Sequence, residues 1–504
     1  MPCPCQRRRV GCSPCVVAAR FGFLMRERFQ RALVPVFGLR RPGRATAPVV
    51  VAGFLAAFLA SFVAVEFASG QNLSPVLLLN TNAAVDSWRD REPSMANDGK
   101  GHWVVVWETL GDPAKQAPGV TQRLAFTRSS DGAVTWTPPA PLTTWGREAR
   151  GADSSPVVAG DADGNWVVAW QSLGTMAGSD ADILFTHSAN AGESWSPPRP
   201  MAAGAGSDSA QDFRPALLVL ADGTWLAAWE TNADIGGAGK DFDIVISRSS
   251  DGGRHWSEPL PLDPEAGKDA DGDRRVVLAA DAEGVVIAAW EAFAAKGGSL
   301  GVDWDILHSR SLDGGRSWSA SAPLSRQAGA DGAAVDDGVA LAAGDGWIAL
   351  WSSAAGQQSG APVRRVWKVF SGDGGATWSD PQPLVAAPAA GRRRGAAAAV
   401  ASAGVEFSPS LAALSGGGFL AAWQSKPREG GGADPVLCVF AEAGASCPAV
   451  TRAAGYADRD GPSLEAAPRV VANGAGAALV WSGDYDWRAD APRDADLRFV
   501  TVER

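Results

Sequence analysis

Acidic residues recur at two fixed positions of an internal repeat, and both positions could do chemistry. A glutamate follows a tryptophan at the end of three similar apolar runs, and an Asp-x-Asp pair precedes another run in four places. Such carboxylates could bind cations or sugar hydroxyls, act as a base, or supply a general acid whose pKa is raised by acidic neighbours. Because they recur with the repeat, structural roles are open too, with the aspartates capping strand ends. They are Glu108, Glu230 and Glu291, and the pairs Asp180/Asp182, Asp241/Asp243, Asp303/Asp305 and Asp494/Asp496.

The elements that must position these carboxylates are marked by a short string that returns about every sixty residues. Its five copies are SSDGAVTW, SANAGESW, SSDGGRHW, SLDGGRSW and SGDGGATW, which start at residues 129, 188, 249, 311 and 371. The Asp or Asn can accept hydrogen bonds from turn amides, glycine permits a positive φ, and tryptophan packs where the next strand begins. We interpret the string as a staple of a turn that need not touch a ligand. The staple residues are Asp131, Asn190, Asp251, Asp313 and Asp373.

Apolar runs in register with this string predict an all-β fold, a seven-bladed β-propeller of four-stranded antiparallel blades. Runs such as NWVVAW and TWLAAW are rich in Val and Trp and bounded by glycine, which is typical of strands buried on both faces. Seven of them end at Trp107, Trp170, Trp229, Trp290, Trp351, Trp423 and Trp481, and each sixty-residue unit has room for four strands. The last unit ends before a fourth strand, so we predict that the N-terminal segment PVLLLN (75–80) completes blade seven.

The first seventy residues differ in composition from the rest and predict export. Ten arginines and two glutamates accompany the apolar run PVVVAGFLAAFLASFVAV (48–65), which is followed by Ala68-Ser69-Gly70. This is the design of a signal peptide, with Met1 or Met25 as its start. The alternative is an uncleaved N-terminal anchor, since eighteen apolar residues can just span a bilayer. We therefore divide the chain into a leader (1–70) and a propeller (71–504), and expect a secreted, periplasmic or cell-surface location.

The net charge of residues 71–504 limits their possible partners, and their two cysteines predict a disulfide. Without the leader's ten arginines and two glutamates, 35 of the 45 basic and 53 of the 55 acidic residues remain, a net charge of about −18. This charge repels nucleic-acid phosphates. The four histidines show no zinc-ligand spacing, so we expect no cofactor. The alternative is Ca²⁺, because DADGD (269–273) resembles the start of a calcium loop, although the rest of that loop does not match. Cys438 and Cys447 should form a disulfide that replaces the staple in the sixth unit, whose turn lacks serine and tryptophan.

The five strings resemble the Asp-boxes, or BNR repeats, of the sialidase superfamily, and the resemblance covers about residues 71–504. It implies an arginine cluster that grips a carboxylate, a tyrosine nucleophile helped by a glutamate, and an aspartate acid/base. Arg91 stands where the family has its first arginine, in an R-I-P motif, although Glu92 replaces the isoleucine. Phe213-Arg214-Pro215 is a second partial match. The alternative for both is that x-Pro merely begins a first strand.

Because the resemblance implies a tyrosine nucleophile, the two tyrosines of the sequence are candidates for that role. Tyr485 lies in SGDYDWRAD, between strands two and three of blade seven, and Tyr456 precedes that blade, so both should face the funnel. The resemblance implies Tyr485 as nucleophile, with Glu230, Glu291 and Asp243 as further catalytic candidates. It implies Arg91, Arg214, Arg488 and Tyr456 as substrate-binding residues. The alternative role of the tyrosines is an aromatic contact for a ligand or a loop.

We therefore expect an exported, monomeric, sialidase-like glycoside hydrolase that acts on extracellular glycans. The alternative is a non-catalytic Asp-box propeller that binds glycan or protein. In either case we expect no nucleic acid partner and no membrane contact beyond an N-terminal anchor. A long link between blades five and six carries Arg392, Arg393 and Arg394, which could close over an anionic ligand or belong to a disordered loop.

Overall fold

The structure is a computed structural model of the whole chain. It describes residues 72–80, 90–110, 122–142, 152–174, 180–205, 208–268, 272–293, 300–329, 334–354, 364–385, 404–427, 433–453, 468–473, 476–484 and 495–503. These ranges all lie in the unit Gln71–Arg504, so the leader and its boundary at residue 70 fall outside the described residues. Within the described ranges, no helix has the length and apolar character that crossing a membrane requires.

The strands fall into seven sheets. Blades one to three are β3 (Asp90–Asn97), β4 (Trp103–Leu110), β5 (Gln122–Ser129) and β6 (Ala140–Pro141); β7 (Ala152–Gly160), β8 (Trp166–Leu173), β9 (Ala181–Ser188) and β10 (Arg199–Pro200); β11 (Asp212–Val219), β12 (Trp225–Thr231), β13 (Asp243–Ser249) and β14 (Leu260–Pro261). Blades four to six are β15 (Gly272–Ala280), β16 (Val286–Phe293), β17 (Trp304–Ser311) and β18 (Ala322–Pro323); β19 (Asp337–Gly344), β20 (Gly346–Ser353), β21 (Arg365–Ser371) and β22 (Gln382–Pro383); β23 (Gly404–Ala413), β24 (Phe419–Pro427), β25 (Asp434–Phe440) and β26 (Thr451–Arg452). Blade seven has β27 (Arg469–Asn473), β28 (Gly476–Asp484) and β29 (Ala495–Glu503), joined by β1 (Asn72–Leu73) and β2 (Leu77–Leu78).

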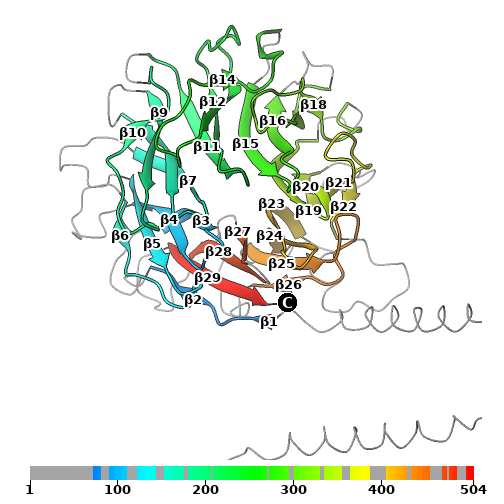
Figure 1. Cartoon of the computed structure of the whole chain (residues 1–504). Coiled ribbons are helices and arrows are strands. Elements are labelled where there is room, and N and C mark those ends of the chain that lie inside the picture. The colour runs from blue at the N-terminus through cyan, green and yellow to red at the C-terminus, as the bar shows by residue number, and fades with distance from the viewer. Residues whose placement is uncertain are drawn as a thin grey trace, which may run out of the picture. The chain divides into compact units, whose positions relative to one another are not determined.

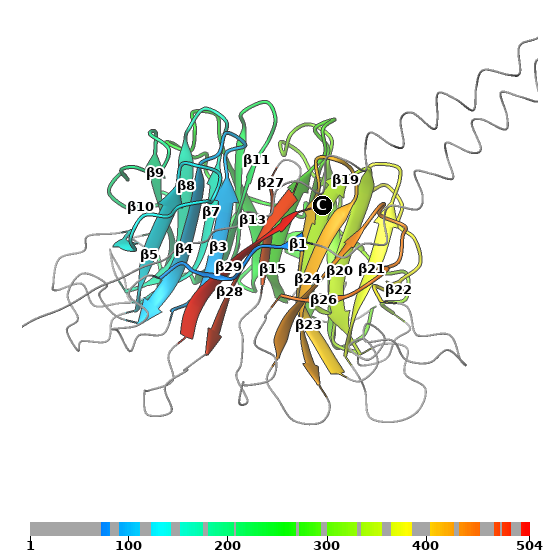
Figure 2. The same cartoon turned by 90° about the horizontal axis from the view of Figure 1, so that it is seen from below.

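These seven antiparallel sheets stand in a ring, which confirms the predicted seven-bladed propeller (Figure 1). Within each of blades one to six, the strands are hydrogen-bonded in chain order. The first strands contact one another from β3 through β7, β11, β15, β19, β23 and β27 back to β3, so they form a closed inner wall. Figure 2 shows the same sheets from the side, with their long strands running between the two faces of the ring.

The second strand of each blade is buried on both faces, as its continuous apolar character predicts. The tryptophan near the end of each second strand, from Trp107 to Trp481, is at most 2% exposed. Among the described residues the apolar core divides into seven clusters, and each cluster joins two neighbouring blades. In one of them, for example, Ile246 of blade three packs with Trp290 of blade four. The hydrophobic effect therefore holds blade against blade around the whole ring.

The N-terminal segment closes the ring on blade seven, as predicted. The predicted single strand over 75–80 is instead two short pieces, β1 and β2, and both pair with β29. Asn80 follows them and is buried. Its Nδ2 donates to Asp90 Oδ2 at 2.9 Å and to Asp496 Oδ1 at 3.0 Å, while its Oδ1 accepts from the Leu497 amide at 3.2 Å. One amide side chain thus joins the N-terminal segment, blade one and blade seven.

The repeated string forms the turn between the third and fourth strands. In blade four, Ser311 Oγ accepts from the Gly315 amide at 2.8 Å and donates to Asp313 Oδ1 at 2.8 Å. Asp313 Oδ1 also accepts from the amides of Arg316 and Ser317, at 3.0 and 2.9 Å. Asp131, Asn190, Asp251 and Asp373 likewise accept a hydrogen bond from the backbone amide four residues further along the chain. These side chains are thus occupied within their own turns.

The tryptophan that ends the string packs onto the third strand of the preceding blade. Trp195 of blade two meets Phe126 of blade one edge-on, with ring centroids 5.8 Å apart. Trp136 of blade one makes the same kind of contact with Phe499 of blade seven, at 5.2 Å across the ring closure. Each string therefore fastens its own turn and also joins two blades.

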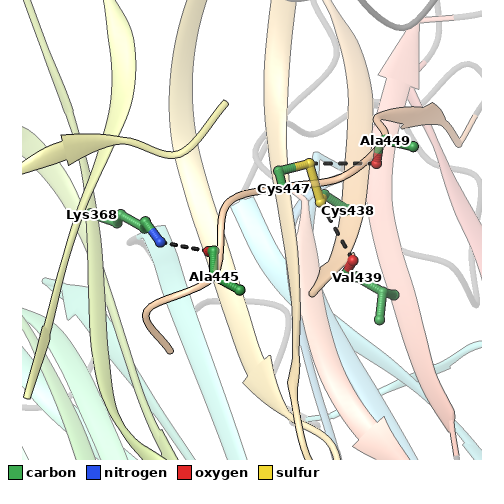
Figure 3. Close-up of a disulfide and its surroundings, with 6 residues drawn as sticks. All are labelled: Lys368, Cys438, Val439, Ala445, Cys447 and Ala449. Carbon is green, nitrogen blue, oxygen red and sulfur yellow. Dashed lines mark hydrogen bonds between the residues drawn. A yellow bond between two sulfur atoms is a disulfide. The ribbon is translucent and has the colours of Figure 1, made fainter. Parts of the chain in front are cut away.

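Blade six lacks this tryptophan, and a disulfide and a buried lysine hold its turn instead (Figure 3). The disulfide joins Cys438 and Cys447, as predicted, with their Cα atoms 6.0 Å apart. Lys368 of blade five is fully buried, and its Nζ donates to the carbonyl oxygens of Gly444 at 2.9 Å and Ala445 at 2.5 Å. Lys368 stands three residues before the serine of its string, where blades one and two have phenylalanine. Its ammonium group replaces the ring contact between the two blades.

Candidate functional site

A β-bulge interrupts the first strand in each of blades one to six, on the inner wall. The extra residue has a positive φ between 48° and 66° in every case. The six residues are Glu92, Ser155, Arg214, Arg275, Gly338 and Ser408. This conformation costs a residue other than glycine roughly 1 kcal/mol or more, so its surroundings must hold it in place.

Three buried glutamates hold bulges across the blade junctions. Each lies near the end of the second strand of one blade and accepts a hydrogen bond from the bulge amide of the next blade. The bonds run from Ser155 to Glu108 Oε1 at 2.7 Å, from Arg275 to Glu230 Oε2 at 3.0 Å, and from Gly338 to Glu291 Oε1 at 2.8 Å. The glutamates therefore link neighbouring blades and stabilise the unusual backbone of the bulges.

The other oxygen of each glutamate pairs with an arginine on the first strand of its own blade. Arg91 Nε lies 3.0 Å from Glu108 Oε2, Arg274 Nε lies 2.7 Å from Glu291 Oε2, and Arg214 pairs with Glu230 Oε1. The glutamate side chains are at most 4% exposed, whereas the arginine side chains are 30 to 44% exposed. Each arginine is thus held by a buried carboxylate, and part of its side chain remains exposed to solvent.

The contacts around these glutamates determine what their carboxylates can do. Burial raises the pKa of Glu108, although the Ser155 amide and the charge of Arg91 act in the opposite direction. Burial likewise raises the pKa of Glu230, against the charges of Arg214 and Arg275. Both carboxylate oxygens of Glu230 and of Glu291 accept hydrogen bonds. These contacts fit the structural role that the sequence left open, which is to link neighbouring blades and hold the bulges.

The structure brings together two arginines that sequence reasoning did not pair. The Arg214 side chain and the Arg275 amide bind the two oxygens of Glu230, so both residues lie at the junction of blades three and four. The Arg275 side chain is 46% exposed and lies 3.5 Å from Glu291 Oε1. The sequence analysis missed Arg274 and Arg275 because it searched for arginine close to a proline, and blade four has no proline after its bulge. The alignment of Asp273-Arg274-Arg275 with Asp212-Phe213-Arg214 could have identified them.

A further arginine, missed for the same reason, lies on the inner wall in blade seven. Arg469 begins β27 and is exposed to solvent. The negative charge of Glu92 in blade one lies close enough to act on its guanidinium. The inner wall therefore carries opposite charges at the junction of blades seven and one.

Aromatic side chains lie beside the arginines of blades three and four. The rings of Phe213 and Phe242 stack with centroids 5.5 Å apart. The Arg274 guanidinium lies 3.4 Å from the ring centroid of Trp304, and Phe293 packs against the same ring at 5.3 Å. Phe293 is 42% exposed. Positively charged and aromatic side chains thus lie next to each other in blades three and four, and both kinds could contact a ligand.

Several candidate residues from the sequence do not lie on this surface. Asp243 opens β13 but is 3% exposed, and Asp182, Asp303, Asp305 and Asp496 are also buried, so these aspartates form no open rim. Tyr485, Arg488 and Tyr456 fall outside the described residues, as do Arg392, Arg393 and Arg394. Asp269 and Asp271 of the suspected calcium loop also lie outside them. Among the residues that are described, no three Asp, Glu, His or Cys side chains are grouped so that they could hold a metal ion.

Comparison with known proteins finds structural likeness only. No protein-family model and no curated protein matches the chain. A Dyadobacter fermentans protein of unknown function matches 86% of this chain and all of its own, with TM-score 0.48 and 14% identity. The leech intramolecular trans-sialidase has TM-score 0.43 and 11% identity, over 73% of this chain and 69% of its own. An α-L-arabinofuranosidase of Fusarium graminearum has TM-score 0.44 and 12% identity, over 70% and 93%. At these identities no function can be transferred from fold alone.

Proposed function

We propose that the inner wall binds a glycan bearing a negatively charged group, and that the chain is an exported, sialidase-like glycoside hydrolase. The observation that carries the binding is the anchoring of Arg214 and Arg275 around Glu230, beside the stacked rings of Phe213 and Phe242. The resemblance of the five repeated strings to Asp-boxes supports the same class of protein.

Anchored arginines suit this ligand for two reasons. A guanidinium has five N–H donors, so Arg214 keeps donors for a ligand carboxylate after binding Glu230. Because Glu230 already restricts the side chain, less conformational entropy is lost on binding. Arg214, Arg274 and Arg275 together carry three positive charges, and their partners Glu230 and Glu291 carry two negative charges. The remaining positive charge can be balanced by a monoanionic ligand.

For the hydrolytic step we propose Tyr485 as the nucleophile. In a retaining reaction of this class, the tyrosine oxygen attacks the anomeric carbon while an acid protonates the leaving oxygen, and water then cleaves the covalent intermediate. In the sequence Tyr485 directly follows β28, and Glu230 and Glu291 lie near the ends of the equivalent strands of blades three and four. Glu230 or Glu291 would serve as base and Asp243 as acid, with Arg488 and Tyr456 as further contacts.

The second candidate is a propeller that binds glycan without cleaving it. It is favoured by the double bonding of Glu230 and Glu291 and by the burial of Asp243, which keep these carboxylates occupied or out of reach.

One experiment separates the two. The purified protein is assayed for turnover of a fluorogenic sialoside and for binding to immobilised sialylated and neutral glycans. The variants are Tyr485→Phe, Arg214→Ala and Arg316→Ala, the last removing a charge from a turn at the opposite end of a blade. Turnover lost in Tyr485→Phe with binding retained supports the hydrolase. Binding that depends on Arg214, without turnover, supports the second candidate. Equal binding by all three variants contradicts the assigned surface.

A further inference from the structure

Each of blades one to six carries a pair of side chains at equivalent places beside its β-bulge. One is the last paired residue of the first strand before the bulge. The other opens the third strand or directly precedes it. The chemistry of the pair changes from blade to blade. In order of the blades, the pairs are Arg91/Gln122, Ser154/Ala181, Phe213/Phe242, Arg274/Trp304, Asp337/Arg364 and Phe407/Ala433.

Of these six pairs, the pair in blade three consists of two aromatic rings. The rings of Phe213 and Phe242 stack with centroids 5.5 Å apart, and both side chains are partly exposed. In blade four, by contrast, the Arg274 guanidinium lies 3.4 Å from the ring centroid of Trp304. Within the described part of the chain, no cation lies over either ring of blade three. Blade three therefore offers apolar ring surface, whereas the ring of blade four holds an arginine.

The charges beside these two pairs differ as well. In blade three, the charge of Arg214 is balanced by Glu230. In blade four, Arg274 and Arg275 share one partner, Glu291, so one positive charge remains. A negatively charged group is therefore attracted to the side of blade four, while blade three suits an uncharged group.

Backbone amides hold the two surfaces next to each other. The amide of Asp273 in blade four donates to the Phe242 carbonyl oxygen at 2.7 Å. The Arg275 amide donates to Glu230 Oε2 at 3.0 Å, and Phe213 stands opposite Glu230 in the strand register. The rings of blade three and the arginines of blade four thus lie on the two sides of one blade junction.

We propose that Phe213 and Phe242 select ligands of at least two sugars, in which an uncharged sugar neighbours the charged one. This inference rests on the proposed function. Arg214 and Arg275 bind the charged group, and the uncharged sugar lies with the C–H groups of one face on the rings of blade three. An aromatic face carries partial negative charge and attracts such C–H groups, which carry partial positive charge. A single charged sugar does not make this contact.

The test measures the affinity of the full chain for three probes by titration calorimetry. They are the methyl glycoside of sialic acid, a thio-linked sialyllactose that cannot be hydrolysed, and lactose as the uncharged probe. We expect the wild type to bind sialyllactose about fivefold more tightly than the methyl glycoside, because of the contact with the rings. In Phe213→Ala the ratio of these two affinities should fall toward one.

Matched variants separate loss of the ring from a general effect on the fold. Phe213→Tyr keeps the ring and should keep the ratio. Phe407→Ala removes the phenylalanine at the equivalent place in blade six, where the partner is Ala433, and should also keep the ratio. If Phe213→Ala shows no cooperative melting transition, Phe213→Leu takes its place, because leucine retains apolar volume without a ring.

Equal affinities of the wild type for the two charged probes would overturn the inference. So would a Phe213→Ala variant that keeps the wild-type ratio. Both results leave the proposed function standing, because the charged sugar is still bound. If neither charged probe binds the wild type, or if lactose binds as tightly as sialyllactose, the proposed function fails and the inference fails with it.

Discussion

The indole nitrogen of Trp378 in blade five donates a hydrogen bond to His308 Nε2 in blade four, at 3.1 Å. His308 Nδ1 lies 2.9 Å from the Ala322 carbonyl oxygen, so the ring is neutral with its proton on Nδ1. Burial lowers the pKa of His308, which agrees with this state. The last residue of a repeated string is thus bound to the neighbouring blade, by a contact that depends on pH.

Replacement of His308 by phenylalanine, the residue at this place in blades one and two, should remove that pH dependence. At pH 7.5 we expect a loss of about 1 kcal/mol in the free energy of unfolding, because the Trp378 indole loses its acceptor. Because the pKa of His308 is depressed, its contribution is present above pH 6.5 and lost as the pH falls through the folded-state value. The difference between His308→Phe and wild type should therefore shrink at pH 5. Urea unfolding at both pH values measures it, and a constant difference would contradict the prediction.

The repeated aspartate should matter for stability and not for ligand binding. Asp313→Ala removes the acceptor of two turn amides and should cost about 1 kcal/mol, as loss of a comparable cap does. Asp313→Asn should be nearly neutral, because Asn190 makes the equivalent bonds in blade two. Thermal unfolding and glycan binding are measured together. A change in ligand affinity that exceeds the change caused by Arg316→Ala would show that the turn belongs to a binding site.

The disulfide and Lys368 should act on the same turn and therefore not additively. Loss of the disulfide in a Cys438→Ala/Cys447→Ala variant should cost ~2 to 3 kcal/mol by the chain-entropy relation. Lys368→Met should cost more in that variant than in the wild type, because the ammonium group then holds the turn alone. A double-mutant cycle from urea unfolding gives the coupling energy, with the exposed Lys268→Met as control. Strict additivity would mean that the two groups hold separate segments.

A third carboxylate at the ring closure should be destabilising in a pH-dependent way. Asn80→Asp places an acid between Asp90 and Asp496, and a buried, uncompensated charge costs about 3 kcal/mol or more. At pH 5 part of this loss should be recovered as the new acid binds a proton. Asn80→Ala, which removes the donor without adding charge, should change less with pH. Scanning calorimetry at pH 5 and pH 8 compares the two variants; equal pH dependence would refute the role given to the charge.

The sequence predicted the architecture because each blade repeats its own pattern. Seven second strands ending in tryptophan set the blade count, and the missing fourth strand of the last unit predicted the closure that β1 and β2 provide. The Cys438–Cys447 bond was predictable because the turn of blade six lacks the string that the other turns carry.

The inner wall was harder to predict because it depends on backbone conformation. A bulge with a positive φ follows no fixed residue type, since Glu92, Ser155, Arg275 and Gly338 all occupy it. The partner of each bulge amide comes from the preceding blade, about 45 residues away for Arg275 and Glu230. Such pairs repeat from blade to blade, but no local pattern in a single segment shows them. The x-Pro pattern found Arg91 and Arg214 and missed Arg274, Arg275 and Arg469 for this reason.

The pairing of Ser74 with Thr501, 427 residues later in the chain, has a consequence for biosynthesis. The segment that completes blade seven is synthesised before every other described strand, and it stays without its partner until residues 495–503 have been made. Until then β29 has not emerged, and the nascent chain presents a free sheet edge and an unmatched strand, both prone to aggregation. Assembly of the ring should therefore end with the joining of these two distant segments, and a chaperone that shields residues 72–80 during translation would raise the yield of folded protein.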